Sequence, residues 1–374
     1  MQVASVLPVC GDFQNVRVLG HCPARTNRPA EVFHMWVNVE EITDTDFAFE
    51  REETAKLSDL LLQIDTDPYA DAGYPAFETA VAGLLDDGRI PQRFKEFCDE
   101  AREWPKSEHP VITLKGCPID PDLPYLDFSD PVVDKRRRKK TYVSEAFLLV
   151  YALLMKQEPI GYANVNDGDV FQDIHPWDRL AHTQSQKALA DIGFHKDLAN
   201  HFVRPDWVNL LGLRQSAETF VSTSYTRNID VLDDLSESQR EVLSEPNFYT
   251  PFDDLTVAGN NVQLGEAEKH PVLGGASEYD IRVFENRTIG LTPDAQQAVY
   301  ALVKLLHRHK RRFRILPGFF LGEANNESIH CKEIIYTPST EALQHRWLQK
   351  TVNVADSQQH AHHFVPGRDR IVNG

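Results

Sequence analysis

The sequence is poor in cysteine and in basic residues. Five cysteines, odd in number and without a C-x-x-C pair, argue against a disulfide framework or a zinc knuckle: Cys10, Cys22, Cys98, Cys117 and Cys331. Lysine and arginine total 39 against 56 aspartates and glutamates, so the net charge is -17. A nucleic-acid-binding protein normally has a basic excess, so we expect no such partner. The negative field favours small cationic ligands over anionic ones.

Long hydrophobic runs are also missing. The longest, 146–155, has about ten residues, roughly half of what a membrane-spanning helix needs. The first residues, MQVASVLPVCGDF, contain neither a basic segment nor a sustained apolar one, so we expect no secretion signal. These absences predict a cytoplasmic protein without a membrane partner.

What remains is the composition of an ordinary globular protein, because 41% of the 374 residues are hydrophobic and 25% are charged. We expect one domain whose first part, 1–140, is rich in helix. Apolar residues recur at helical spacing over 52–63 and 77–104, the second stretch being broken near Pro91. The basic run 135–140 can bind anions or act as a nuclear signal, but the apolar helix expected directly after it, over 143–157, favours a solvated helix start.

From residue 160 onward, short extended runs alternate with turn residues, which is typical of a β-sandwich or barrel. The expected strands cover 207–213, 281–284, 313–321, 328–336 and 347–355, and an amphipathic helix covers 292–311. The acidic stretch 226–262 supplies little core and predicts either a lid over a site or a disordered segment. The polar end of the chain, 357–374, predicts a flexible tail that includes His360, His362 and His363. The predicted fold class is mainly β with flanking helices.

Candidate chemistry is concentrated in two places. His195 and Asp197 are separated by one residue, and an imidazole with a carboxylate supplies two of the three ligands of a facial Fe(II) site. The triplet alone is a weak signal, since a surface histidine beside a surface aspartate looks the same. His330 lies in an extended run and can provide the third ligand, and Arg346 follows at a strand start, where its planar guanidinium suits a dicarboxylate. Together, in this order, they indicate one site.

This order resembles the clavaminate synthase-like group of Fe(II)- and 2-oxoglutarate-dependent oxygenases. The resemblance covers residues 158–356 and rests on PIGYANVNDGDVFQDIHP, on FHKD followed by RPDWVNLLGLR and TFVS, on PVLGGASEYDIRV, and on ESIHCKEI with HRWLQK. Within the group, the sequence is similar to hydroxylases of free asparagine, arginine and lysine. The resemblance implies a double-stranded β-helix (jelly-roll) core. It also implies Fe(II), with 2-oxoglutarate and O2 as co-substrates.

The resemblance also implies functions for individual residues of this sequence. His195, Asp197 and His330 match the iron ligands; Arg346 matches the arginine that binds the distal carboxylate of 2-oxoglutarate, and Thr219 a threonine that assists it. Relatives place a second arginine four residues later, against the substrate carboxylate. This chain has Lys350 there, which keeps the charge and loses the bidentate geometry.

Two further departures bear on the reaction. Relatives commonly have glutamate where this chain has Asp197, and related halogenases have a small residue, so hydroxylation is favoured over halogenation. Where relatives show Asn-Gln-Asn, this chain has Asn164, Val165 and Asn166. We expect Asn166 to contact the substrate, and the hydrogen bond made by the missing glutamine to be absent or supplied elsewhere.

For the substrate, Glu278 and Asp280 lie where relatives hold a cationic side chain, although ordinary acidic turn residues would look the same. Lysine is therefore expected first and arginine second, with hydroxylation at C3 or C4. The lid carboxylates Asp230, Asp233 and Asp234 are better interpreted as a solvated surface. Two alternatives stay open. One is an enzyme acting on a neutral or carrier-bound amino acid, and the other is a non-catalytic β-barrel binding protein, which the intact ligand set argues against.

Overall fold

A computed structural model describes residues 41–71, 73–252, 267–368 and 370–373. Residues 39–374 cluster as one compact unit, and the account below concerns this unit alone. Cys10, Cys22, the N-terminal segment and the end of the expected lid, 253–262, lie outside the described residues. The three other cysteines are buried and free, which agrees with the absence of a disulfide framework. No helix among the described residues is long and apolar enough to cross a membrane.

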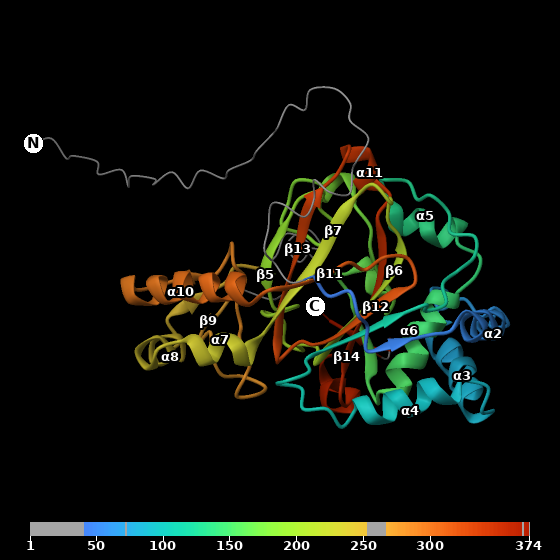
Figure 1. Cartoon of the computed structure of the whole chain (residues 1–374), viewed down its shortest axis with the longest axis horizontal. Helices are drawn as coiled ribbons and strands as arrows, with labels where there is room; N and C mark the ends of the chain where they lie inside the picture. Colours follow the sequence, from blue (N-terminus) through green and yellow to red (C-terminus); the bar gives the residue numbers. More distant parts are fainter. Residues whose placement is uncertain (1–40, 72, 253–266, 369, 374) are drawn as a thin grey trace, which may run out of the picture. The chain divides into compact units, whose positions relative to one another are not determined.

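The larger of two main sheets has eight strands, and its central strands are β12, β6 and β14 (Figure 1). Its members are β1 (Phe47–Ala48), β2 (Val111–Lys115), β12 (Phe319–Ala324), β6 (Trp207–Arg214), β14 (Trp347–Val354), β3 (Glu158–Tyr162) and β15 (Ile371–Val372) in this order, with β4 (Gln172–Ile174) paired to β14. The helix-rich N-terminal part thus contributes strands to the sheet. Both faces of β6 are buried, which explains its nearly continuous apolar sequence.

The second sheet has four strands and faces the first. Its order is β11 (Arg311–Phe313), β7 (Phe220–Arg227), β13 (Ser328–Tyr336) and β5 (Ile192–His195). One core cluster joins the inner faces of the two sheets, including Val208 and Leu210 of β6, Tyr225 of β7, and Leu348 and Val352 of β14. This arrangement is the double-stranded β-helix that the sequence resemblance implies.

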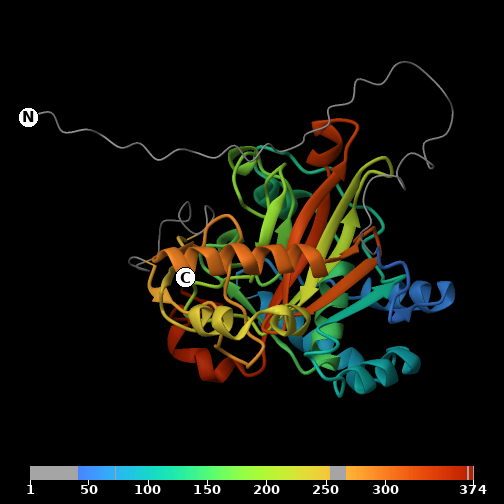
Figure 2. The same ribbon diagram turned by 60° about the vertical axis from the view of Figure 1, so that its left-hand side comes forward.

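Three helices lie on the outer side of the four-stranded sheet (Figures 1 and 2). α7 (Asn228–Asp234) and α10 (Pro293–His309) contact β7, and α8 (Glu237–Leu243) packs against α10. Thr292 caps α10 by accepting from the backbone N–H of Ala295. A third, small sheet of β10 (Ile289–Gly290), β8 (Phe248–Tyr249) and β9 (Lys269–His270) lies in the same part of the chain.

The prediction that 226–262 supplies little core is wrong for its described part. Val231, Leu232, Leu235 and Leu243 are buried in a cluster with α10. Their spacing places them on one side of two short helices, so a few apolar residues among many acids are enough to form a core.

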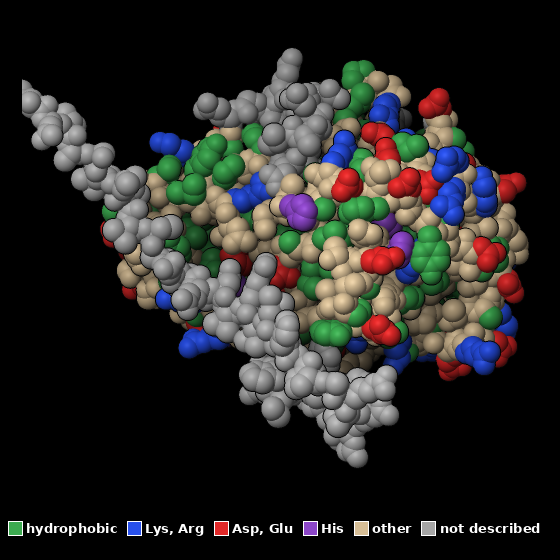
Figure 3. Space-filling model, turned by 90° about the horizontal axis from the view of Figure 1, so that it is seen from above, with side chains coloured by type: hydrophobic (Ala, Val, Ile, Leu, Met, Phe, Trp, Pro, Cys, Tyr) green, Lys and Arg blue, Asp and Glu red, His purple; other side chains and the backbone are tan. Residues whose placement is uncertain are grey.

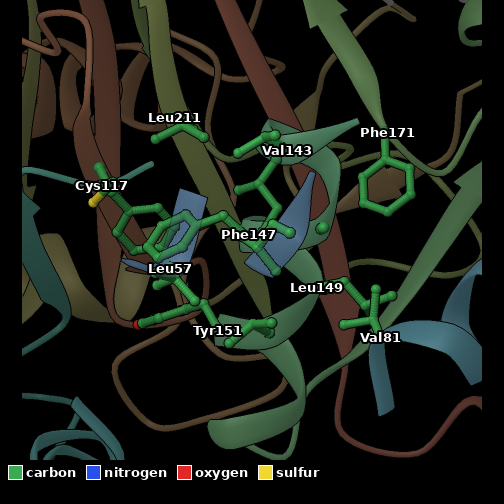
Figure 4. Close-up of a cluster of buried hydrophobic side chains, with 14 of the residues drawn as sticks. Leu57, Val81, Cys117, Val143, Phe147, Leu149, Tyr151, Phe171 and Leu211 are labelled. Carbon is green, nitrogen blue, oxygen red and sulfur yellow. The ribbon is translucent and has the colours of Figure 1, made fainter. Parts of the chain in front are cut away.

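The outer face of the eight-stranded sheet is covered by N-terminal helices: α2 (Arg51–Leu61), α3 (Gly73–Asp86), α4 (Gln92–Ala101) and α6 (Val143–Leu154). Figure 4 shows part of their core, in which Phe147 of α6 lies among Leu57, Cys117 and Leu211. Pro91 separates α3 from α4 as the sequence predicts.

The basic run 135–140 differs from its prediction. It lies in and after α5 (Pro131–Arg138), and two of its lysines are buried rather than solvated. Lys135 Nζ lies 2.6 Å from Asp173 Oδ2, and Lys139 Nζ lies 2.6 Å from Glu145 Oε2 and 2.9 Å from Asp120 Oδ2. These long side chains cross from α5 into the layer between helices and sheet, so their charges serve the fold.

Other expected elements are partly wrong. The single strand expected over 313–321 is divided between β11 and β12, and 281–284 forms only isolated bridges. The end of the chain is not a free tail. Ser357–His363 form a 3-10 helix and β15 pairs with β3, because the final apolar pair, Ile371 and Val372, is buried against the sheet. α11 (Thr340–Gln344) connects β13 to β14.

On the face seen in Figure 3, basic side chains are interspersed with acidic ones rather than gathered in one patch. This pattern provides no continuous basic surface there for a phosphate backbone.

Lys139→Met should destabilise the fold, because Glu145 and Asp120 would remain buried without their cation. Breaking a buried ion pair by removing one partner costs about 3–5 kcal/mol. Urea unfolding should show this loss in the free energy of unfolding, while Lys140→Met, at the exposed neighbouring position, should change it little. Equal stability of the two variants would contradict the buried network.

Candidate metal and co-substrate site

Three potential metal ligands meet inside the barrel. His195 ends β5, Asp197 follows two residues later, and His330 lies in β13 directly opposite His195 in the antiparallel register. One donor atom from each lies within 4.8 Å of the others. Two imidazoles and one carboxylate in this arrangement match the donor set of facial Fe(II) sites.

Alternation along β13 explains why His330 points inward. Ile329 and Cys331 are packed in the cluster beneath α10, on the outer face. Because successive side chains of a strand point to opposite faces, His330 and Lys332 project into the barrel. Both line the same cavity.

Each of the two histidine rings has a second contact, through its Nδ1 atom. His195 Nδ1 donates to the carbonyl oxygen of Gly193 at 2.9 Å, which leaves Nε2 free to face the site. His330 Nδ1 lies 2.8 Å from Oε2 of the buried Glu323, whose other oxygen accepts from Ser328 Oγ. Outer contacts of this kind orient metal-binding imidazoles and raise their affinity for the metal.

The turn between β12 and β13 fixes the segment that carries Asp197. Asn325 Oδ1 accepts from the backbone N–H of Asp197 at 3.1 Å, and its Nδ2 donates to the Asp197 carbonyl at 3.2 Å. The side chain of Lys196 is buried, lies 2.5 Å from Asp280 Oδ1 and donates to Asn326 Oδ1 at 2.6 Å. The turn that leads into the His330 strand therefore also positions the aspartate.

Lys350 of β14 lies beside the metal ligands. Its Nζ lies 2.6 Å from Asp197 Oδ2 and donates to Gln186 Oε1 at 3.1 Å. Burial opposes ionisation of Asp197, but Lys350 and the two histidines hold its pKa well below the usual value. Lys350 lines both cavities that meet at the ligands, so its ammonium is available to a bound molecule in either.

The first cavity, of about 90 Å³, is lined by apolar side chains and by neutral polar ones. The amide and hydroxyl side chains are those of Gln172, Gln184, Ser185, Gln186, Asn200 and Thr250. Nε2 of Gln172 is buried and has no hydrogen-bond partner among the described residues. Asp197 is the only carboxylate among the described residues that line this cavity, so the lining suits a neutral polar group better than a cationic one.

The second cavity, of about 40 Å³, contains Arg346, Lys332 and Thr223 in addition to the ligands and Lys350. Burial lowers the pKa of Arg346 to about 10, and Nε of this guanidinium has no partner. Burial and the proximity of Arg346 lower the pKa of Lys332 to about 7. An anion placed between these groups would reverse both shifts, because an opposite charge favours the charged form.

The structure does not bring four of the predicted residues to the cavities. Thr219 lies before β7, where its carbonyl accepts from Gln215 and Arg314, and Thr223, four residues further on, lies beside Arg346 instead. Asp280 is paired with Lys196 and does not reach either cavity.

Glu278 is exposed, outside both cavities. Asn166 is buried behind the first cavity, where it accepts from Lys187 and donates to Asp173 at 3.5 Å. Of the lid carboxylates, Asp230 pairs with Arg227 and Asp234 with His309, which agrees with their interpretation as surface residues. Glu278 and Asp280, on which the prediction of a cationic substrate rests, are therefore not among the described residues that line the two cavities.

Sequence reasoning missed four residues of the site. Lys332 could have been found, because it lies two positions after His330 and so shares its face of a strand. Gln172, Thr223 and Glu323 carry no signal in the sequence alone, since their places depend on the register between strands that are distant in the chain.

Comparisons with known proteins agree with this geometry, although no family model matches the sequence. L-asparagine oxygenase of Streptomyces coelicolor is 28% identical over 250 residues, which are 66% of this chain and 71% of that protein. Clavaminate synthase 2 of Streptomyces clavuligerus is 23% identical over 245 residues, 65% of this chain and 74% of that protein.

Two solved structures have the same fold. Asparagine oxygenase in complex with Fe(II), 2S,3S-3-hydroxyasparagine and succinate superposes with a TM-score of 0.73 at 22% identity, covering 88% of this chain and 100% of that one. The non-heme iron oxygenase OrfP, in complex with Fe, succinate and (3S)-hydroxy-L-Arg, superposes with a TM-score of 0.70 at 22% identity. The match covers 87% of this chain and 99% of that one. Both likenesses confirm the double-stranded β-helix.

Glu323→Ala should lower the affinity for a divalent metal about 10- to 100-fold, because His330 loses the carboxylate that orients it. Titration of the metal-free protein with Mn(II), against a competing chelator, measures this directly. The exposed Glu218→Ala serves as the matched control. An unchanged affinity in the Glu323 variant would mean either that His330 is not a metal ligand or that Glu323 does not orient it.

Proposed function

Because this chain belongs to the clavaminate synthase-like family of Fe(II)- and 2-oxoglutarate-dependent oxygenases, we propose that it hydroxylates a free α-amino acid with a neutral, polar side chain. The observation that carries the proposal is the polarity of two adjoining cavities. One combines amide and hydroxyl side chains with apolar ones and has no acid other than Asp197 in its described lining. The other contains buried cations and the three metal ligands, of which His195 and Asp197 line both cavities.

The ligand set fits iron. His195 and His330 offer imidazole nitrogens and Asp197 a carboxylate oxygen, and these residues line the cavities, so an iron held by them would be accessible to molecules bound there. When bound, the iron with 2-oxoglutarate and O2 supplies the oxidising chemistry. The contribution of the protein is to hold one carbon of the substrate in place and to exclude water.

The second cavity suits the co-substrate. 2-Oxoglutarate is a dianion, and the guanidinium of Arg346 can bind its distal carboxylate through paired hydrogen bonds. Thr223 offers a hydroxyl from the facing sheet. Arg346 thus keeps the role that the sequence predicts, while Thr223 replaces Thr219 as the assisting hydroxyl.

The first cavity suits the amino acid. Lys350 can hold its carboxylate, as the sequence predicts, from a position between the two cavities. The Gln172 amide lies opposite Lys350 in the pairing of β4 with β14, and its nitrogen, which has no partner among the described residues, can bond a polar group of the bound amino acid. The preference for lysine rested on Glu278 and Asp280, and neither lines this cavity. A neutral side chain is therefore favoured, and arginine and lysine become competitors to test.

A panel of free amino acids tests the choice of substrate. With Fe(II), 2-oxoglutarate and O2, we expect asparagine or glutamine to give a hydroxylated product and stoichiometric succinate, and lysine, arginine and norleucine to give less. Mass spectrometry of the amino acid and quantification of succinate are the measurements. Preferential hydroxylation of lysine or arginine would contradict a neutral pocket.

Gln172→Leu tests the amide that lines the first cavity. Losing one hydrogen bond, worth about 1 kcal/mol, should raise the KM for the amino acid about fivefold and leave the KM for the co-substrate unchanged. Gln358→Leu, at an exposed position, is the control. Parallel changes in both KM values would assign Gln172 to the fold rather than to the substrate.

A further inference from the structure

The inner end of the second cavity contains two cations from facing sheets. Lys332 projects inward from β13, and Arg346 lies directly before β14. Both also line a third cavity, directly adjoining, which contains no carboxylate among its described lining residues. Two basic side chains are thus held close together in a desolvated place.

Neither cation is paired with an acid of the described residues. Among the ion pairs of the described residues, none involves Lys332 or Arg346. The acid that acts on Lys332 from a distance is Asp191, which is exposed and accepts from the backbone N–H of Ile334. Glu333, the next residue along β13, pairs with Lys310 and Arg312.

Burying unpaired charges is costly unless an ion of opposite sign joins them. Lys332 has only a neutral partner among the described residues, which offsets burial of its charge less than an anion would. Its Nζ donates to one carbonyl oxygen, that of Ala188, at 2.7 Å. An ammonium has three donors, so two remain for a ligand. In register, Lys332 lies opposite Thr223, whose hydroxyl faces the same cavity.

We propose that Lys332 is a second cation for the distal carboxylate of 2-oxoglutarate, acting with Arg346 and opposite it across the barrel. This inference rests on the proposed function, since it assumes that 2-oxoglutarate occupies the second cavity. Lys332 then sets the selectivity of the site for a dicarboxylic 2-oxo acid over a monocarboxylic one. Its contact with Ala188 keeps the ammonium aimed into the cavity.

A purely structural role makes a different prediction. If Lys332 only ties residue 188 to β13, its loss would distort the cavity for every 2-oxo acid. If it binds the distal carboxylate, its loss would lower the affinity for 2-oxoglutarate. The affinity for 2-oxobutanoate, which has no such group, would stay unchanged. The ratio of the two affinities therefore separates the two roles.

The experiment is calorimetric titration of the full chain loaded with Mn(II), without O2 and without amino acid. 2-Oxoglutarate and 2-oxobutanoate are titrated into the parent, Lys332→Met, Lys332→Arg and the exposed control Lys304→Met. We expect Lys332→Met to lower the affinity for 2-oxoglutarate at least about tenfold and the affinity for 2-oxobutanoate less than about twofold. The reason is that a charge-assisted hydrogen bond is lost for one ligand only. Lys332→Arg should retain most of the discrimination, and Lys304→Met all of it.

Two results would overturn the inference alone: unchanged 2-oxoglutarate affinity in Lys332→Met, or an equal loss for both ligands. If the methionine variant does not fold, Lys332→Gln provides the same comparison with a neutral donor. Failure of the Mn(II)-loaded parent to bind 2-oxoglutarate would instead overturn the proposed function, and the inference with it.

Discussion

The antiparallel pairing of β5 with β13 sets His195 directly opposite His330, and the whole site depends on this register. A shift by one residue would turn His330 and Lys332 toward α10 and bring Ile329 and Cys331 inside. The register is held by packing, since Ile329 and Cys331 are buried beneath α10. The outer helices therefore contribute to the chemistry by fixing which face of β13 points inward.

Charge inside the barrel has the opposite sign to the charge of the chain. The net charge of -17 favours cationic ligands on composition alone, yet the second cavity contains Arg346, Lys332 and Lys350 with Asp197 as the one carboxylate of its described lining. A dianionic co-substrate complements this local excess. The field of the whole protein affects encounter, whereas the residues that line a cavity decide what binds in it.

The sequence predicts the strand that carries His330 and, through the family resemblance, the three ligands. β13 has the expected bounds, because alternation can be read within one segment. His195, Asp197 and His330 converge, as their order along the chain and the resemblance predict. The assignment of Asp280 to the substrate failed, since its partner Lys196 lies 84 residues away and no local pattern reveals a buried ion pair. The same limit applies to the contribution of the acidic stretch to the core.

The central claim is that iron and 2-oxoglutarate bind together at the junction of the two cavities. The most direct measurement is the visible absorption of the protein after anaerobic addition of Fe(II) and 2-oxoglutarate. A 2-oxo acid chelated to Fe(II) produces a charge-transfer band, which should appear only when both are present and should be absent in His195→Ala. No band in the parent protein, or an equal band in His195→Ala, would contradict the account.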